Sequence, residues 1–281
     1  MHLHADRPDV PEARGVNVPR SLLFVPGNRP EMIAKVPRWS PDAVAVDLED
    51  AVAAGDKDDA REAAVRAVAE LPAGVQIFVR VNATATSWHA DDVAAVAGSA
   101  AHGVVLPKLE DPAQLADLAG RLGLPVIGGL ETVRGVARCR ELAAGCLAVY
   151  FGAEDYIASI GGRRTSGGLE VLHARSEVVL AAALAGVGAL DQAVVAARDT
   201  DAFRVDSAAG RDLGYDGKIC IHPSQVALAH EAFTPTDEEV AHARAVIEAG
   251  RSGVGVVDGE MVDDVHLRMA AAVLQRAGVD A

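Results

Sequence analysis

Acidic residues end two neighbouring apolar runs of this sequence. Glu131 ends the run PVIGGLE (125 to 131), and Asp155 ends the run LAVYFGAED (147 to 155). If these runs form adjacent strands, the two carboxylates lie about one strand spacing apart, ~5 Å. Two hard oxygen ligands with room for water and substrate suit Mg²⁺, and Mn²⁺ would also fit. The pair therefore predicts a divalent-metal site, with solvated acids or helix N-caps as the alternative.

Arg80 is a second chemical signal, because it lies inside the apolar run QIFVRVN (76 to 82). An always-charged guanidinium is costly in such a strand unless an anion accompanies it. The anion could be internal, with Glu49 and Asp50 as candidates. It could equally be a substrate carboxylate or an enolate oxygen, since the planar guanidinium matches both. The residues alone leave these possibilities open.

Lys108 and a glycine-rich segment suggest other chemistries. A lysine on a barrel strand could form a Schiff base with a keto substrate, although a solvated or ion-paired lysine is the other interpretation at the end of its run. The segment SIGGRRTSGG holds Arg163 and Arg164 among four glycines, so it could bring amides and two cations to a phosphate. No Walker motif, dinucleotide fingerprint or Ser-His-Asp arrangement is evident.

The elements that must position these residues are eight short apolar runs separated by alanine-rich helical segments. The runs are SLLFVPG (21 to 27), AVAVDLED (43 to 50), QIFVRVN (76 to 82), GVVLPK (103 to 108), PVIGGLE (125 to 131), LAVYFGAED (147 to 155), LDQAVV (190 to 195) and GKICIHP (217 to 223). Most are continuously apolar, which is typical of parallel strands buried on both faces. Eight βαβ units in under ~230 residues favour an α/β fold with a closed (β/α)8 TIM barrel over an open doubly wound sheet. The working residues of such barrels lie at the carboxyl ends of the strands.

The chain divides into three predicted parts. We expect residues 1 to 18 to be a disordered N-terminal extension, residues 19 to 234 to be the barrel, and residues 235 to 281 to be a helical appendage or lid. A capping signal at Thr236 to Glu239 predicts the start of a helix, Gly250 to Gly255 breaks the chain, and a turn with an amphipathic helix follows.

Composition and charge limit the possible partners. A chain of 281 residues that is 50% hydrophobic can bury one large core. A net charge of −14 argues against nucleic acid and anionic membranes as partners and favours a small metabolite. Without a run of ~18 uncharged apolar residues or a signal-peptide pattern, the expected location is cytoplasmic. Three cysteines in no metal-binding spacing predict neither disulfides nor a zinc site.

Nine ordered motifs between about residue 20 and residue 275 resemble the citrate lyase beta-subunit-like family of the HpcH/HpaI, pyruvate-type aldolases. The motifs are RSLLFVPGNRPE, VAVDLEDAV, FVRVN, VVLPK, GGLETVRG, FGAEDYIASIGG, HARS, GKICIHPSQV and DGEMVDD. This family includes malyl-, citramalyl- and citryl-thioester lyases. The simpler metal aldolases of the wider group carry a histidine on strand two, which DLEDAV lacks.

The resemblance implies a role for each matching residue. Glu131 and Asp155 would bind Mg²⁺, and Arg80 would hold the substrate oxygen or carboxylate beside the ion. Glu49 and Asp50 would order the metal's waters or the arginine.

Further roles are implied at the edge of the site. Backbone amides of Ala153, Glu154 and Asp155 would bind the carboxylate of a 2-oxo acid, and Asp263 of GEMVD would move a proton to or from the enolate carbon, often in a neighbouring subunit. The arginines that could bind coenzyme A are Arg29, Arg163 and Arg164.

The function implied is a Mg²⁺-dependent carbon–carbon lyase. It would cleave a 3-hydroxyacyl-CoA of the malyl-, citramalyl- or citryl-CoA type to acetyl-CoA and a 2-oxo acid through an enolate. Alternatives are a malate-synthase-like condensing enzyme or thioesterase, and the citryl-acyl-carrier-protein lyase component of a citrate lyase complex. The resemblance also implies a homotrimer or hexamer.

Overall fold

The computed structural model describes residues 18 to 279, apart from residue 73 and residues 251 to 254. The predicted disordered extension, residues 1 to 18, therefore lies outside the described residues except for Val18.

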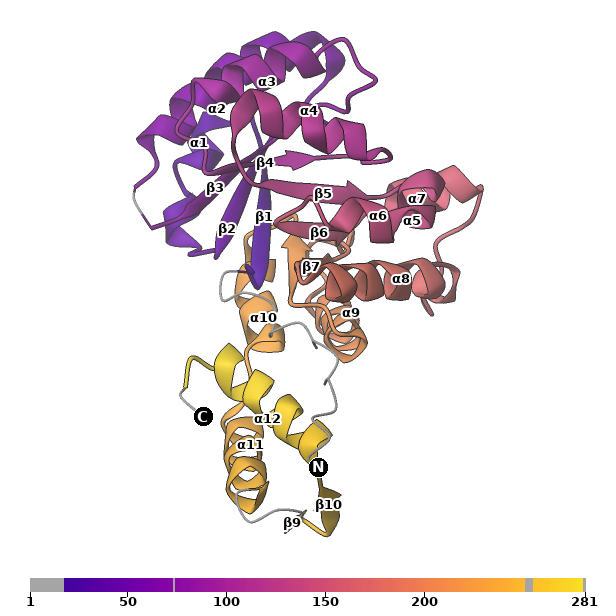
Figure 1. Ribbon diagram of the computed structural model, residues 1–281. Coiled ribbons are helices and arrows are strands. Elements are labelled where there is room, and N and C mark those ends of the chain that lie inside the picture. The colour runs from indigo at the N-terminus through magenta and orange to yellow at the C-terminus, as the bar shows by residue number, and fades with distance from the viewer. Residues whose placement is uncertain (1–17, 73, 251–254, 280–281) are drawn as a thin grey trace, which may run out of the picture.

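Eight parallel strands close into a barrel (Figure 1). They are β1 (Ser21–Pro26), β2 (Ala43–Asp47), β3 (Gln76–Arg80), β4 (Gly103–Leu106), β5 (Val126–Leu130), β6 (Ala148–Phe151), β7 (Gly188–Asp191) and β8 (Gly217–Cys220). The pairing of β1 with β8, which sets Leu22 opposite Ile219, closes the ring. The predicted (β/α)8 barrel is confirmed.

Helices between the strands cover the barrel. They are α1 (Pro30–Ile33), α2 (Lys57–Glu70), α3 (His89–Ala97), α4 (Pro112–Leu122), α5 (Val133–Ala137), α6 (Cys139–Ala143), α7 (Ala153–Ile160), α8 (Leu169–Ala185), α9 (Thr200–Leu213) and α10 (Ser224–Phe233), with short 3-10 turns η1 (Val36–Arg38) and η2 (Ala54–Asp56). Local sequence starts several of them. Asp111 caps α4 by accepting the Ala113 N–H at 2.9 Å, as expected of an acid at an N-cap.

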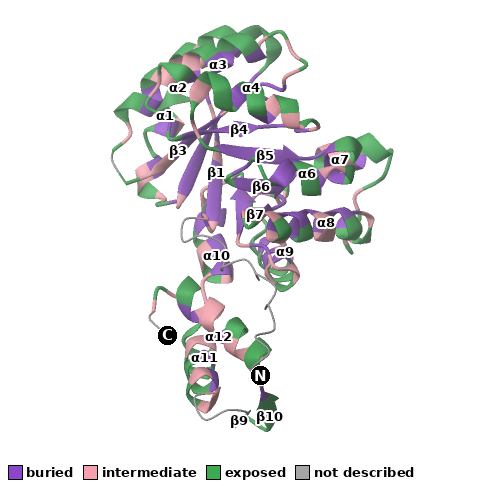
Figure 2. Cartoon of the chain, in the orientation of Figure 1, coloured by how far each residue is buried: buried purple, intermediate pink, exposed green. Residues whose placement is uncertain are grey.

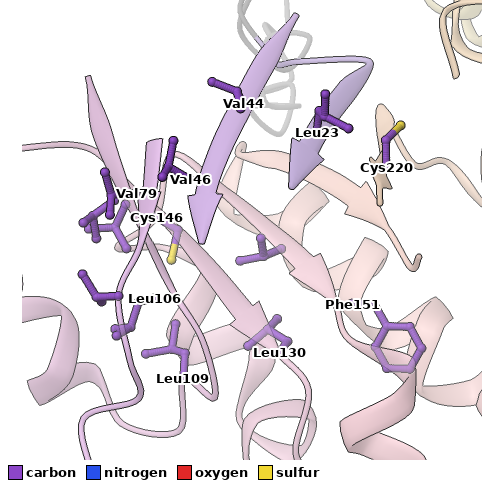
Figure 3. Packing of buried hydrophobic residues seen from close by; sticks show 14 of the residues in the cluster. Leu23, Val44, Val46, Val79, Leu106, Leu109, Leu130, Cys146, Phe151 and Cys220 are labelled. Carbon is purple, nitrogen blue, oxygen red and sulfur yellow. The ribbon is translucent and has the colours of Figure 1, made fainter. Parts of the chain in front are cut away.

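Two layers of apolar side chains fill the fold. One lies inside the barrel and includes Leu22, Phe78 and Ile127. The larger one lies between strands and helices and includes Val46 and Leu106 (Figure 3). Because side chains of a strand alternate between these two layers, both faces of each strand are buried, which explains the continuous apolar runs.

Strand β7 corrects one expectation. The run at 190 to 195 predicted this strand, but the strand is Gly188–Asp191 and the chain leaves the sheet at Gln192. Gly188 packs so closely that a Cβ there would lie 2.6 Å from Cγ1 of Val18. The strand therefore begins at a glycine, which weakens its signal in the sequence.

The appendage leaves from the amino-terminal side of the barrel. Helix α10 returns along the barrel until Thr234 accepts a 2.8 Å hydrogen bond from Nη1 of Arg20, which directly precedes β1. Beyond it lie α11 (Asp237–Gly250), the hairpin of β9 (Gly255–Val257) and β10 (Glu260–Val262), and α12 (Asp264–Arg276). The predicted capping signal is present, because the N–H of Thr236 donates to the carboxylate of Glu239 and the N–H of Glu239 donates to the Thr236 hydroxyl.

The appendage has a small core of its own, formed by residues such as Val246 and Leu274. Figures 1 and 2 show it projecting from the barrel with much of its surface exposed. Over the described part of the chain, no helix is long and apolar enough to cross a membrane.

Candidate active site

A cavity of about 420 Å³ opens at the carboxyl ends of the barrel strands. Apolar and charged side chains both line it. The apolar ones include Phe24, Pro26, Ala193, Val195, Ile219 and Ile221, and the charged ones are Asp47, Asp50, Arg80, Glu131, Glu154 and Asp155. The structure thus brings acids and an arginine together beside an apolar surface.

Arg80 is bound by an acid of the neighbouring strand. Its Nε lies 2.7 Å from Oδ1 of Asp47 and its Nη2 lies 2.5 Å from Oδ2, while Nη1 lies 2.9 Å from Oε2 of Glu49. Burial alone would lower the pKa of Arg80, but the charge and hydrogen bonds of Asp47 raise it well above its usual value. Of the expected internal partners, Glu49 is a contact and Asp50 is only within 4.0 Å. Asp47 is the principal partner.

Lys108 bridges several acids of the site. Its Nζ lies 2.6 Å from Oε1 of Glu49, 3.6 Å from Oδ1 of Asp155 and 3.8 Å from Oδ2 of Asp50. Burial lowers the pKa of Lys108, but Glu49 more than offsets this, so the net shift is upward. An ammonium held in this way cannot act as an amine nucleophile, so the Schiff-base interpretation is disfavoured.

Glu131 follows β5 and is buried, with 2% of its surface exposed. Its Oε1 accepts the Lys108 N–H at 2.6 Å, and its Oε2 accepts the Tyr150 hydroxyl at 3.1 Å. Gly152 gives it room, because a Cβ at that position would overlap the Glu131 side chain. Burial, with repulsion from Glu49, raises the pKa of Glu131 to about 7. This carboxyl group is therefore poorly solvated as an anion.

The sequence suggests that Asp155 ends a strand, but the structure places it elsewhere. Strand β6 ends at Phe151, the chain turns at Gly152, and Asp155 lies in the first turn of α7. The first N–H groups of a helix have no partner within the helix and form its positive end. The amides of Ala153, Glu154 and Asp155 are such groups, so they can bind an anion. The Glu154 side chain itself pairs with Arg164 at 2.6 Å.

The three arginines suggested for coenzyme A differ in position. Arg164 pairs with Glu154 and lies 3.2 Å from Oε1 of Gln192. Arg163 is exposed, and the Arg29 side chain is 61% exposed with its nearest acid, Glu31, at 4.0 Å. None of the three belongs to the described lining of the cavity.

Asp263 is not brought to this cavity by its own chain. It is the N-cap of α12, where Oδ1 accepts the N–H of Val265 at 2.9 Å and lies 2.7 Å from Nδ1 of His266. These hydrogen bonds, chiefly that of the His266 side chain, lower the pKa of Asp263. Because the appendage leaves from the amino-terminal side of the barrel, only a different chain could bring this residue to the cavity in the conformation described.

Two residues of the site carried no recognisable signal in the sequence. Nζ of Lys57 donates at 2.7 Å to the carbonyl oxygens of Leu48 and Glu49 and to Oδ1 of Asn82, so it fixes the loop that carries the acids after β2. Tyr150 reaches Glu131 from inside the barrel. In the sequence, a lysine in a charged helix predicts an exposed side chain, and a tyrosine in an apolar run predicts a buried one without a role in the site.

The carboxylates suit an ion that also binds water and substrate. Among residues 18 to 279, gaps excepted, no group of three or more His, Cys, Asp or Glu side chains is arranged to hold a metal. Glu131 and Asp155 both line the cavity, and the charge of Asp155 contributes to the raised pKa of Glu131. Two carboxylates with open space beside them are a donor set that Mg²⁺ accepts, since it usually keeps several waters.

Comparison with known proteins gives concordant matches. The sequence profile of the HpcH/HpaI aldolase/citrate lyase family matches residues 20–223. A citrate lyase subunit beta-like protein of Deinococcus radiodurans is 47% identical over 273 residues, which cover 91% of this chain and 96% of that protein. A (3S)-malyl-CoA thioesterase of Cereibacter sphaeroides is 34% identical over 268 residues, covering 92% of this chain and 94% of that protein.

The fold has a similar match among solved structures. The CitE protein of Mycobacterium tuberculosis, in complex with magnesium, acetoacetate and coenzyme A, has 37% sequence identity and a TM-score of 0.84. The match covers 94% of this chain and 100% of that one. The likeness therefore includes the appendage as well as the barrel.

Proposed function

The chain belongs to the HpcH/HpaI aldolase/citrate lyase family, and from this premise we propose that it is a Mg²⁺-dependent lyase of 3-hydroxyacyl-CoA thioesters. The products are acetyl-CoA and a 2-oxo acid. One observation carries the proposal: Glu131, Asp155 and Arg80 line a single cavity at the carboxyl ends of the strands. The related CitE complex, which contains magnesium and coenzyme A, supports both ligands.

Glu131 and Asp155 are the residues that would hold Mg²⁺ in this proposal. When bound, the ion polarises a carbonyl oxygen and stabilises negative charge that develops on it. The side-chain ammonium group of Lys108 neutralises part of the acidic cluster. The backbone N–H of Lys108 donates a hydrogen bond to one oxygen of Glu131. Below its raised pKa, the buried carboxyl group of Glu131 would give up a proton on becoming a ligand.

Arg80 acts as a fixed cation beside the reacting oxygen. Its bonds to Asp47 leave the guanidinium little freedom, so it needs no reorganisation when charge develops near it. The helix-start amides of Ala153 to Asp155 bind the carboxylate of the 2-oxo acid. Glu49 holds both Arg80 and Lys108 in place.

Cleavage requires movement of one proton at each end of the breaking bond. A base takes the proton of the 3-hydroxyl as the carbon–carbon bond breaks, and the bonding electrons pass to the thioester enolate. Asp263 from a neighbouring chain then protonates the enolate carbon, which gives acetyl-CoA. A trimer or hexamer satisfies this geometry, and Arg164 is the arginine best placed to meet coenzyme A at the rim.

Purified protein assayed with malyl-, citramalyl- and citryl-CoA tests the proposal. We expect at least one thioester to yield equal amounts of acetyl-CoA and a 2-oxo acid with Mg²⁺, and none to be cleaved after chelation with EDTA. Cleavage by the purified chain alone would also remove the need for an acyl-carrier protein. If no thioester is cleaved with Mg²⁺ present, the proposed function is wrong.

Thioester hydrolysis is a second candidate, favoured by the similarity to a (3S)-malyl-CoA thioesterase. The two activities differ in their products. Free coenzyme A released in step with turnover indicates a thioesterase, and intact acetyl-CoA indicates a lyase.

A further inference from the structure

Tyr150 connects the interior of the barrel to Glu131. The residue is 2% exposed, and its hydroxyl donates to Oε2 of Glu131 at 3.1 Å. The other oxygen of Glu131 accepts the Lys108 N–H at 2.6 Å. Both carboxylate oxygens are therefore held by donors from other segments of the chain, which fixes the orientation of the carboxylate plane.

The tyrosine ring is itself held in place. Tyr150 pairs with Gly129 across β5 and β6, and Glu131 lies two residues after Gly129, directly beyond the end of β5. A Cβ at position 129 would lie 2.6 Å from Cζ of Tyr150, so only glycine leaves room for the ring to cross to Glu131. On another side the ring meets Phe24 edge-on, with centroids 6.3 Å apart. The hydroxyl thus has a defined position.

We propose that Tyr150 is a positioning residue that aims the Glu131 carboxylate at the metal, and that Gly129 makes this contact possible. The inference rests on the proposed function, because it takes Glu131 as a ligand of Mg²⁺. Tyr150 acts through Glu131 and needs no contact with the substrate. Without the hydroxyl, Oε2 has no remaining donor among the described residues, and the carboxylate can rotate away from the ion.

Substitution of such supporting groups commonly weakens metal affinity by about 10- to 100-fold. The test is the Tyr150→Phe variant, which keeps the ring and removes only the hydroxyl. Tyr215→Phe is the matched control, because Tyr215 is 1% exposed and its hydroxyl donates to the Arg175 carbonyl at 2.8 Å, away from the cavity.

Isothermal titration with Mg²⁺ alone gives a readout that does not depend on turnover. At about one pH unit above the pKa of Glu131, we expect Kd to rise by about 10- to 100-fold in Tyr150→Phe and to stay within about twofold in Tyr215→Phe. Thermal unfolding of both variants shows whether the two lost hydrogen bonds cost similar stability. Gly129→Ala, which displaces the ring, should weaken binding in the same direction.

Two outcomes would overturn the inference. In the first, the Tyr150→Phe variant remains folded and binds Mg²⁺ with the same Kd as the unsubstituted protein. This result would show that the hydroxyl does not position Glu131. Unsubstituted protein that binds no Mg²⁺ would overturn the proposed function, and this inference with it. The first result leaves the proposed function intact, so the two failures are distinguishable.

Discussion

Arg80 and Asp47 face each other on neighbouring strands and form an ion pair with two hydrogen bonds, in which Nε of Arg80 lies 2.7 Å from Oδ1 of Asp47. The Asp47 side chain is 1% exposed and the Arg80 side chain 11% exposed. The pair is therefore almost entirely removed from water. It combines a structural role in the barrel with the placement of a cation at the cavity.

Removal of Asp47 should destabilise the protein strongly. Breaking a buried pair by removing one partner costs about 3–5 kcal/mol, because the other charge stays buried without compensation. We expect Asp47→Ala to lower the free energy of unfolding by this amount in urea denaturation. Asp50→Ala is the control, since the Asp50 side chain is 60% exposed and 4.0 Å from Arg80. Equal effects of the two substitutions would show that the pair contributes little.

Mg²⁺ binding should depend on pH around neutrality. The pKa of Glu131 is raised to about 7 by burial, so below that pH the ion must displace a proton from a ligand. The affinity should then rise about tenfold for each pH unit up to about 7 and level off above it. Titration calorimetry between pH 6 and 8 in buffers of different ionisation enthalpy would also detect the released proton. An affinity that is flat over this range would contradict the ligand role of Glu131.

The barrel could be predicted because each strand is buried on both faces. Val44 and Val46 pack under helices, and Ala43 and Ala45 pack inside the barrel, so the run is apolar without alternation. The order of motifs likewise identified the family. Strand β7 was misplaced because it begins at Gly188 and ends at Asp191, whereas the apolar residues that continue the run after Gln192 lie outside the sheet.

The partners within the site could not be predicted. Asp47, Glu49 and Asp50 lie within four positions, and only the register of β2 against β3 sets Asp47 opposite Arg80. Asp155 was assigned to a strand because its run contains no break except Gly152, the residue before the helix begins. The separation of Asp263 from the cavity depends on the path of α10, which is a tertiary feature.

Lys108 should not form a Schiff base with a 2-oxo acid at neutral pH, because that reaction requires an uncharged amine. Its pKa is raised by Glu49 in spite of burial, so the group stays an ammonium ion. We expect borohydride reduction in the presence of pyruvate to add no substrate mass to Lys108, as judged by peptide mass spectrometry. A reduced adduct at this lysine would restore the Schiff-base mechanism.

Asp263→Asn should separate catalysis from binding. Because Asp263 lies on the appendage and outside the cavity of its own chain, we expect loss of lyase activity of at least about 100-fold with unchanged binding of Mg²⁺ and 2-oxo acid. Glu131→Gln should lose metal binding instead.

Mixing these two inactive variants tests whether the site is completed by a neighbouring chain. A mixed assembly contains some cavities with an intact Glu131 served by an intact Asp263, so part of the activity should return. Differently tagged chains would verify that mixed assemblies have formed. If these assemblies stay inactive, Asp263 does not act in a neighbouring site.

A crystal structure of this chain grown with Mg²⁺ and pyruvate tests the central claim most directly. The account predicts one ion bound by the carboxylates of Glu131 and Asp155, with the pyruvate carboxylate at the amides that begin α7. An ion bound elsewhere, or these two side chains turned away from it, would contradict the proposed chemistry.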